Sequence, residues 1–463
     1  MPIEIKDVNL GGIADSPYQG IANSVAALVG LDIHGSPGLI KCSQRLIKDS
    51  GTTVDDAVSA IVSCSDGSTY FFGKTNGKIW KRTSGGTWSL EATAAPAAGT
   101  VGIMDAVEFG GYIYYSMQSR LGRWQVGTAW SGRNDNFGTF LKADPTYHPI
   151  IVSNLVLYIG DASQIDDVDG GIFHTDRVHL DDKYRVKSLG EMGNEIIIGS
   201  YVADSVNEVL GFRWNTWSAQ VSSHDSVPET SVNAFLPTDN YVFAQCGGKG
   251  NFYSYDGAQF QQTKRLQGDW SGTNKAEVKP NAVAFFRVPL FGMSNVSGNP
   301  CLQGVYSFGG YGNNYPKVMA LEYVISTGHT SNIEIHAIKA VGDLLFVAWK
   351  DLTGGTAYGV DVLDTSNKYT GGYFDTRVIG VDRAHNKQFR IFLPYRALPA
   401  GTDITLYMSK NGAAFAAVDT INDADRLMKY TEVKADNAVF VQFRAVLTAN
   451  ANSTPEVEGL ILE

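Results

Sequence analysis

Residues 66–88 read Asp-Gly-Ser-Thr-Tyr-Phe-Phe-Gly-Lys-Thr-Asn-Gly-Lys-Ile-Trp-Lys-Arg-Thr-Ser-Gly-Gly-Thr-Trp. Two runs rich in aromatic and β-branched residues lie between Gly- and Asn-containing clusters, a composition typical of β-strands. Asn76-Gly77 separates the runs, and Asn-Gly is the strongest short signal for a β-hairpin because its tight turn requires positive φ. The segment therefore predicts consecutive antiparallel strands.

The same pattern of a turn followed by an apolar run recurs along the chain, with turns near residues 67, 111, 154, 194, 240, 287 and 342. The steps are about 40 to 55 residues, and a period near 45 residues is typical of a β-propeller blade. Blades packed radially bury each other's apolar faces. We therefore predict an all-β chain with a β-propeller of seven blades over residues 56–374. Six blades is an alternative because the sixth unit, around 288–308, is degenerate, and a β-sandwich array is the competing architecture.

The flanking regions lack this period. Residues 375–463 alternate strand and turn patterns, with Asn411-Gly412 as a hairpin signal, which predicts a small antiparallel β-sandwich or jelly-roll. Residues 1–55 are glycine-rich and irregular, and we interpret them as an N-terminal arm that packs against or completes another element. Ile21, Val25, Leu28 and Val29 have helical spacing and predict at most one short helix.

Composition narrows the class of protein. The 463 residues are 44% hydrophobic and 18% charged, which favours a folded globular chain over a disordered one. The net charge is −10 and there is no basic run, which argues against specific nucleic-acid binding. No apolar stretch approaches the roughly 20 residues that span a bilayer, so we expect no membrane insertion. The first seven residues lack the features of a signal peptide, which predicts synthesis in the cytoplasm without a secretion signal.

The four cysteines lie far apart without a CxxC pair, and we predict buried thiols rather than a disulfide framework or a zinc site. They are Cys42, Cys64, Cys246 and Cys301.

The densest acidic stretch, residues 161–170, offers weak candidates for calcium ligands, because carboxylates at alternating positions before a glycine can surround the ion. The candidates are Asp161, Asp166, Asp167 and Asp169. EF-hand spacing is missing, and a solvated blade loop is the alternative. Downstream, His174, Asp176 and His179 are close in sequence, but a strand places His179 on the face opposite the other two, which disfavours zinc.

No nucleophile elbow, phosphate-binding glycine loop or HExxH motif is present, so we predict no catalytic residues and no cofactor. A propeller hydrolase could still gather carboxylates from several blades without any sequence period. The tryptophans occur at similar places within the blades, and we predict that they form inter-blade core, with sugar stacking as the alternative. They are Trp80, Trp88, Trp124, Trp130, Trp214, Trp217 and Trp349.

The two ends of the chain carry a resemblance to a known family. Residues 8–41, with Asn-Leu-Gly-Gly and later Gly35-Ser-Pro-Gly-Leu, resemble the opening of tailed-bacteriophage tail and neck proteins. Residues 453–462, Ser-Thr-Pro-Glu-Val-Glu-Gly-Leu-Ile-Leu, are similar to the final strand common in that group. The resemblance implies a non-enzymatic virion structural protein, a tail hub, adaptor or baseplate subunit in a cyclic homo-oligomer that contacts other tail and neck proteins.

The residues permit this interpretation, because an irregular arm that reaches a neighbouring subunit is a common way to build a ring. Two other functions stay open. One is a glycan- or host-receptor-binding propeller, which requires exposed aromatic side chains with acid and amide groups on one face. The other is a propeller glycoside hydrolase, which requires two convergent carboxylates.

Overall fold

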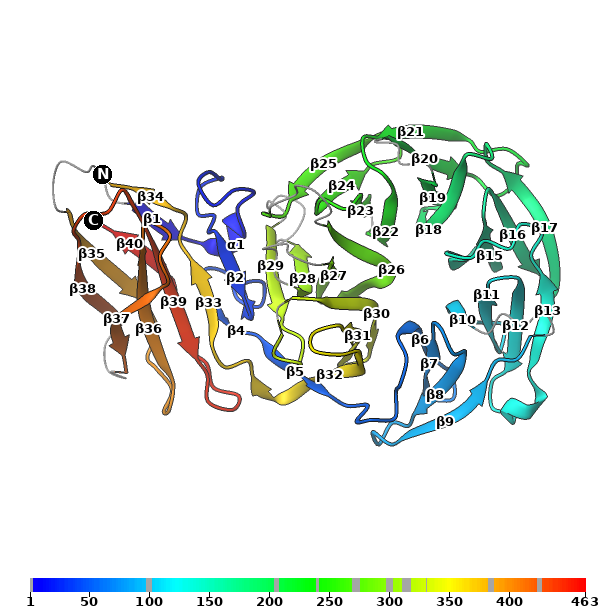
Figure 1. The fold of residues 1–463 in the computed structure, drawn as a ribbon, viewed down its shortest axis with the longest axis horizontal. Helices are drawn as coiled ribbons and strands as arrows, with labels where there is room; N and C mark the ends of the chain where they lie inside the picture. The colour runs from blue at the N-terminus through cyan, green and yellow to red at the C-terminus, as the bar shows by residue number, and fades with distance from the viewer. Residues whose placement is uncertain are drawn as a thin grey trace.

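The computed structural model describes residues 3–96, 102–203, 208–238, 241–268, 275–296, 303–309, 318–329, 331–381, 387–422 and 427–463. These residues are almost entirely β-structure. The only helices described are α1 (Val8–Gly11) and the 3-10 helix η1 (Trp130–Gly132), and neither is long enough to cross a membrane. A ring of blades lies at one end of the molecule and a β-sandwich at the other (Figure 1).

Seven four-stranded antiparallel units, described within these ranges, form the ring of a β-propeller. Blades one to three contain β6 (Val58–Ser63), β7 (Thr69–Gly73), β8 (Lys78–Arg82) and β9 (Trp88–Thr93); β10 (Ile103–Phe109), β11 (Tyr112–Met117), β12 (Arg120–Gln125) and β13 (Asn134–Thr139); and β14 (Ile150–Ser153), β15 (Val156–Asp161), β16 (Gln164–Asp169) and β17 (Ile172–His179). Blades four and five contain β18 (Tyr184–Met192), β19 (Glu195–Val202), β20 (Val209–Trp214) and β21 (Ser223–Val227); and β22 (Val232–Pro237), β23 (Val242–Cys246), β24 (Asn251–Tyr255) and β25 (Phe260–Arg265).

Blade six contains β26 (Lys275–Phe286), β27 (Val288–Val296), β28 (Gly304–Gly309) and β29 (Val318–Tyr323). Blade seven contains β30 (Ile333–Val341), β31 (Leu344–Asp351), β32 (Ala357–Lys368) and, from the N-terminal part of the chain, β5 (Gln44–Lys48). The first strand of each blade contacts the first strand of the next, from β6 to β30 and back to β6, so these strands line the axis of the ring.

The all-β propeller prediction is confirmed, and the blades number seven because the degenerate sixth unit is a complete blade. The recurring turns at 67, 111, 154, 194, 287 and 342 each connect the first and second strands of a blade, whereas the turn at 239–240 lies outside the described residues. At Asn76-Gly77 only the glycine has positive φ, 65°, and the Asn76 Oδ1 accepts the Lys78 N–H at 2.9 Å. The hairpin is therefore real, but its turn is longer than the two-residue type that its sequence suggests.

Strand β5 closes the ring by backbone hydrogen bonds to β32 of blade seven. It pairs antiparallel with β32, with Ile47 opposite Val362 and Leu46 opposite Leu363. Blade seven is therefore assembled from two segments about 300 residues apart in sequence, and their pairing joins the two ends of the ring.

The β-sandwich contains two sheets whose aromatic side chains meet between them, with the Phe389 and Phe443 rings 5.5 Å apart. One sheet has the order β1 (Ile3–Lys6), β40 (Gly459–Leu462), β35 (Lys387–Pro394) and β38 (Met428–Ala435). The other has β33 (Gly372–Asp375), β39 (Phe440–Thr448), β36 (Asp403–Lys410) and β37 (Ala416–Ile421), with the short β34 (Ile379–Gly380) also on β39. Because β1 pairs with β40, the two ends of the chain lie side by side (Figure 1).

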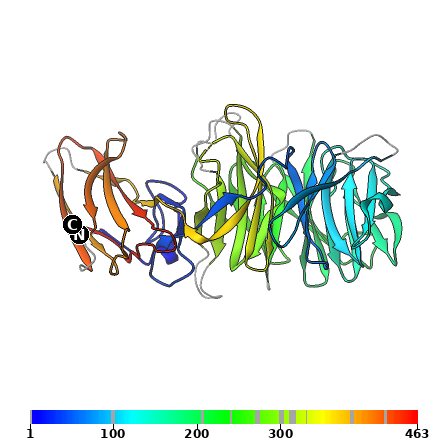
Figure 2. The ribbon, with the colours of Figure 1, turned by 90° about the horizontal axis from the view of Figure 1, so that it is seen from below.

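Strand β2 (Ala27–Val29) joins the two bodies. It lies between β29 of blade six and β33 of the sandwich, which makes one continuous ten-stranded sheet. The hairpin of β3 (Leu31–Asp32) and β4 (Lys41–Cys42) follows. Figure 2 shows this N-terminal segment, in blue, between the propeller and the sandwich. Residues 8–42 are therefore the structural junction of the molecule.

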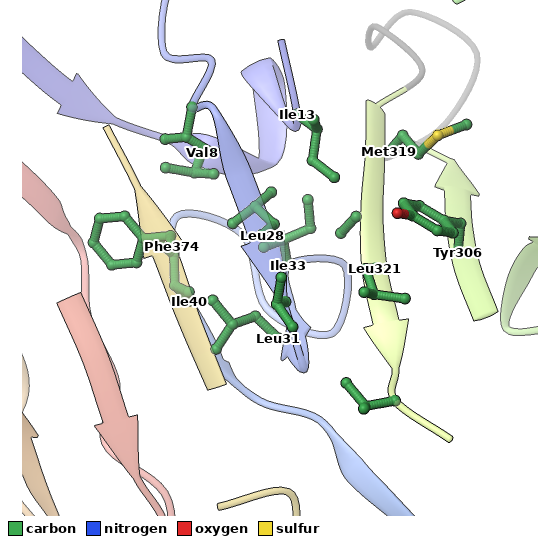
Figure 3. Close-up of a cluster of buried hydrophobic side chains, with 14 of the residues drawn as sticks. Val8, Ile13, Leu28, Leu31, Ile33, Ile40, Tyr306, Met319, Leu321 and Phe374 are labelled. Carbon is green, nitrogen blue, oxygen red and sulfur yellow. The ribbon is translucent and has the colours of Figure 1, made fainter. Parts of the chain in front are cut away.

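The helix predicted around residues 21–29 is wrong. Val25 forms an isolated bridge with Ile13, and residues 27–29 form β2. Leu28 and Val29 point to opposite faces of the strand and are both buried in the core cluster of Figure 3, while β29 and β33 pair with the two edges of β2. A strand buried on both faces does not alternate apolar and polar residues, so the spacing of its apolar residues can resemble the spacing in a helix.

Leu28 gives a direct test of the junction. Its side chain is fully buried in the cluster drawn in Figure 3, near Ile33 and Phe374. We expect Leu28→Ala to lower the free energy of unfolding by about 3 kcal/mol, since the substitution leaves a cavity that neither body can fill. Leu141→Ala, at an exposed leucine, is the matched control and should change it by less than about 0.5 kcal/mol. Equal effects in denaturant titration would contradict this role of Leu28.

Candidate binding site in the central cavity

A recurring irregularity shapes the axis of the propeller. The register of the first strand shifts near its beginning in six blades, at Ser59, Met104, Lys187, Asn233, 279–282 and His336. A β-bulge of this kind leaves a residue unpaired and changes the direction of its side chain. The bulges therefore bring polar side chains from different blades to the same end of the ring.

All of these bulges except the one at Asn233 contribute residues to the lining of a cavity of about 40 Å³, which we call the central cavity. That volume has room for about three water molecules. Its lining comes from blades one, two, three, four, six and seven and consists of Ser59, Lys74, Met104, Asp105, Thr146, Tyr147, His148, Pro149, Lys187, Lys279, Pro280, Asn281 and His336. The cavity lies where the first strands begin.

Two of the lysines that line the central cavity, Lys187 and Lys279, lie beside the same carboxylate, that of Glu277. Lys187 is buried and its Nζ donates to Asn233 Oδ1 at 2.6 Å, with Glu277 Oε2 at 3.9 Å. Lys279 forms a short ion pair with the same Glu277. Burial lowers the pKa of Lys187 to about 8. Although burial opposes ionisation of Glu277, the charges of Lys279 and Lys187 hold its pKa at about 2. The glutamate is therefore a fixed negative charge between two lysines.

A second ion cluster lies on blade seven. Glu334 accepts a hydrogen bond from His336 Nε2 at 3.3 Å and lies 3.7 Å from Lys350 Nζ. The hydrogen bond from His336 lowers the pKa of Glu334 to about 2 despite the cost of burial. Burial lowers the pKa of His336. This carboxylate is also ionised at neutral pH.

Asp105 joins blades rather than facing a ligand. Its Oδ1 accepts the Ala106 N–H at 2.7 Å and the Asn281 amide at 2.8 Å, and its Oδ2 accepts the Ile150 N–H at 2.7 Å. Burial raises its pKa to about 6. With both oxygens occupied by donors from three blades, Asp105 acts as a structural connection.

The carboxyl groups described around the central cavity do not form the pair that glycoside hydrolysis requires. A glycosidase needs one carboxyl group that stays protonated near neutral pH as general acid, beside a second carboxylate. Glu277 and Glu334 are held ionised by cations, and Asp105 is occupied by three hydrogen bonds.

The four calcium candidates lie in blade three and do not converge. Asp161 and Asp166 are buried on one face, where both accept hydrogen bonds from Gln164 Nε2. Asp167, the next residue along β16, points to the other face and Asp169 is exposed at the strand end. No group of three or more His, Cys, Asp or Glu in the described ranges is arranged to hold a metal ion.

The histidines downstream pair with different carboxylates. His174 Nδ1 lies 2.7 Å from Asp167 Oδ1, whereas His179 contacts Asp176 at 3.2 Å and Asp182 at 3.1 Å. The prediction that Asp176 shares a face with His174, opposite His179, is therefore wrong, because the register of β17 shifts there and the positive φ of Asp176, 59°, brings its carboxylate to His179.

The tryptophans are mostly core, as predicted, with one exception. Those at 80, 124, 130, 214 and 349 are buried, and Trp88 is half-buried with its Nε1–H donating to Asp49 Oδ2 at 2.8 Å. Trp217 is 89% exposed in the loop after β20, so the core prediction is wrong there.

Cys42, Cys64 and Cys246 are buried free thiols, which confirms that prediction for three of the cysteines. Cys301 lies outside the described residues.

No protein-family model and no curated protein sequence matches the chain. Solved β-propeller structures do align with it. The extracellular domain of a hybrid two-component system from B. thetaiotaomicron is 14% identical over 80% of this chain and 44% of that chain, with a TM-score of 0.48. This chain thus spans less than half of that protein's length.

Two other aligned structures are shorter. A chain of the mitotic checkpoint complex is 12% identical over 70% of this chain and 94% of its own length, with a TM-score of 0.46. Streptogramin B lyase is 11% identical over 70% and 98%, with a TM-score of 0.44. These similarities concern the fold alone.

Proposed function

We propose that the chain is a non-enzymatic structural protein of a bacteriophage virion, a tail hub, adaptor or baseplate subunit that works through protein–protein contacts in a cyclic homo-oligomer. The observation that carries this proposal is the position of the two segments with the family resemblance. Ile40 and Val457 exchange backbone hydrogen bonds of 2.8 and 3.0 Å, so residues 8–41 and 453–462 meet in one structural unit. The C-terminal segment with the resemblance thus packs on the junction, so the two segments are neighbours in the fold.

The junction suits a structural subunit. The ten-stranded sheet runs from blade six through β2 into the sandwich. Lys264 also forms an ion pair with Asp15, and Gln267 donates to the carbonyl oxygens of Ala14 and Ala26 at 2.7 and 3.0 Å. These contacts hold the sandwich in a fixed orientation to the propeller. A fixed orientation lets one subunit determine where its neighbours bind.

The N-terminal segment is used within its own chain, so the contact between subunits needs another surface. Strand β38 lies at the edge of its sheet, and Met428 and Tyr430 are exposed on its outer face. The Tyr430 ring lies 5.2 Å from Phe392 of β35. An exposed edge strand with apolar side chains is a ready surface for another chain. We assign this edge to the neighbouring copy.

The test measures assembly and particle association. Native mass measurement should give a ring of defined order, and the protein should be present in purified particles. We expect Tyr430→Lys to reduce the ring to smaller species while leaving the melting temperature unchanged. Tyr18→Lys, at an exposed tyrosine far from the sandwich edge in sequence, should leave the ring intact. A monomer that is absent from particles would refute the proposal.

A second candidate is glycan binding, favoured by Trp217. Its indole is exposed, and Asn215 Oδ1 fixes the loop by accepting the N–H groups of Trp217 and Ser218 at 3.2 Å each. A held and exposed tryptophan is suited to stacking on a sugar ring. Glycan-array binding that disappears in Trp217→Ala would support this function over the first.

A further inference from the structure

We propose that an apolar patch at one end of blades three and four receives the β38 edge of the neighbouring copy, so that the ring is built head to tail. We call it the receiving patch, and it consists of Leu155, Asp169, Ile172 and Trp217. The inference rests on the cyclic homo-oligomer proposed above and identifies the second half of its contact.

A ring of identical subunits needs two different surfaces on each copy. A surface that meets itself closes as a dimer, whereas a contact between two different surfaces continues from copy to copy around a ring. The β38 edge is one of these surfaces. Figure 1 shows β38 at one end of the molecule and β16 and β17 of blade three at the other. The edge therefore does not reach blade three of its own chain, but it can reach blade three of the next copy.

The receiving patch contains the two most exposed large hydrophobic side chains in the part of the chain that the structure describes. Trp217 is 89% exposed and Leu155 is 84% exposed. Ile172 is exposed as well, at 62%. Single exposed apolar residues are ordinary on a protein surface, but a group of them is typical of an interaction site.

These side chains lie at one end of the propeller, opposite to the end with the central cavity. Leu155 lies in the turn between β14 and β15, Ile172 follows the turn between β16 and β17, and Trp217 lies in the loop between β20 and β21. Consecutive strands of a blade run in opposite directions, so the first and third turns of each blade share an end. Asn154, beside Leu155, donates to the carbonyl oxygen of Asn194 at 3.3 Å. The ends of blades three and four are therefore in contact.

The loop that carries Trp217 is fixed against blade three. The Tyr158 ring of β15 lies 5.3 Å from the Trp214 ring of blade four. The Trp214 Nε1–H donates to the carbonyl oxygen of Ser218 at 2.7 Å, and Ser218 directly follows Trp217. The exposed indole thus stands beside the end of blade three, and the two blades form one surface.

The backbone at Leu155 also indicates a contact. Asn154 and Leu155 have φ of 50° and 62°, a conformation that asparagine and glycine adopt far more readily than leucine. Blade two has Gly110 and Gly111 in the corresponding turn, with φ of 58° and 79°. Leucine is therefore unfavourable for this turn, and its exposed side chain adds no burial to its own fold. Contact with another chain explains an apolar side chain at this position.

The charges of the two surfaces have opposite signs. Asp169 is exposed at the end of β16, and the turns that form the receiving patch contain no lysine or arginine. On β38, Lys434 is exposed on the same outer face as Tyr430. Glu432 lies between them, with Arg390 Nε 3.5 Å from its carboxylate. The edge thus brings apolar side chains and a positive charge to a surface with apolar side chains and a negative charge.

The experiment mixes two variants that each remove a different half of the contact. Tyr430→Lys keeps the receiving patch, and Leu155→Asp keeps the edge. Aspartate adopts positive φ more readily than leucine, so the turn should persist, whereas a carboxylate is costly in an apolar contact. Sedimentation equilibrium should give monomers for each variant alone and a one-to-one dimer, without a ring, for the mixture. Leu141→Asp, at an exposed leucine near the central-cavity end, is the matched control and should leave the ring intact.

The outcomes separate this inference from the function on which it rests. A wild-type chain that forms no ring would refute the proposed function, and the receiving patch with it. A ring that persists in Leu155→Asp, or a mixture that stays monomeric, would overturn the receiving patch alone. Melting curves show whether the variants fold. If Leu155→Asp does not, Trp217→Asp takes its place in the same mixture, with the same expected and contrary results.

Discussion

A chain that begins at residue 52 should fail to form the native propeller. This truncation removes β5, which leaves β32 of blade seven without its outer partner and opens the ring. It also removes β2, so the continuous sheet between blade six and the sandwich is broken and a large apolar surface becomes exposed. Native domains are stable by only about 5–15 kcal/mol, so the loss of both strands and of the core side chains they carry should leave no stable fold. We expect loss of cooperative thermal unfolding and aggregation on size-exclusion chromatography.

A circular permutant supplies the matched control. The chain ends lie side by side because β1 pairs with β40, with Ile3 opposite Leu462. A short linker can therefore join residue 463 to residue 1, with the new ends at the exposed turn of Gly51 and Thr52. This permutant has the same break as the truncation but keeps every strand, so it should fold. A truncated chain that still melts cooperatively near the wild-type temperature would show that β5 and β2 are dispensable.

The seven blades could be predicted from sequence because each contains a local signal. The turn between the first two strands of a blade needs positive φ, and Gly111 and Gly342 supply it with φ of 79° and 57°. A turn depends only on the few residues that form it, so the regular spacing of the turns can be seen in the sequence. Even the degenerate sixth blade contains such a turn, at Arg287 with φ 64°.

The N-terminal segment could not be predicted in the same way. Strands β1, β2 and β5 pair with partners more than 280 residues away. Such pairings produce no pattern among neighbouring residues from which they could be predicted. Strand β5 buries only Leu46 fully, so its pattern resembles that of a polar loop. The sequence therefore predicts an arm that completes another element, but it does not identify residues 44–48 as the outer strand of blade seven.

The central cavity could not be predicted from the sequence either. Its residues come from six blades, and each is an ordinary polar residue near the start of a strand. One signal was available. Ser59, Lys187 and His336 interrupt apolar runs at the same place in the blade period, where the register shifts. A polar interruption repeated in phase with the blades indicates side chains turned toward the axis.

The acidic stretch of blade three leads to a second large effect, on the pH dependence of stability. Asp166 is fully buried, and its Oδ1 accepts the Gln164 amide and the Asp176 N–H, each at 2.9 Å. Its Oδ2 and the Oδ1 of Asp161 have no hydrogen-bond partner in the described residues. Burial, together with the charge of Asp161, raises the pKa of Asp166 to about 7, from 3.8. The folded protein therefore holds this proton where the unfolded chain has released it.

Asp166→Asn should accordingly stabilise the protein at alkaline pH. Because the folded-state pKa is raised, the contribution of Asp166 is complete below about pH 4 and is lost as the pH rises through about 7. A difference of about three pH units corresponds to about 4 kcal/mol at most. The asparagine keeps the Oδ1 acceptor, carries no charge, and its amide can donate to Asp161. We expect a gain of up to about 4 kcal/mol at pH 8 and almost none at pH 4.

Denaturant titrations at pH 4, 6 and 8 measure this difference, with Asp169→Asn as the control at an exposed position of the same strand. The control should follow the wild-type pH profile, because a solvated carboxylate has no burial cost to remove. If Asp166→Asn and Asp169→Asn give the same profile, the buried carboxylate does not limit stability. If calcium protects the wild-type chain but not Asp166→Asn, the Asp166 carboxylate binds the ion rather than a proton, which is the role that its sequence first suggested.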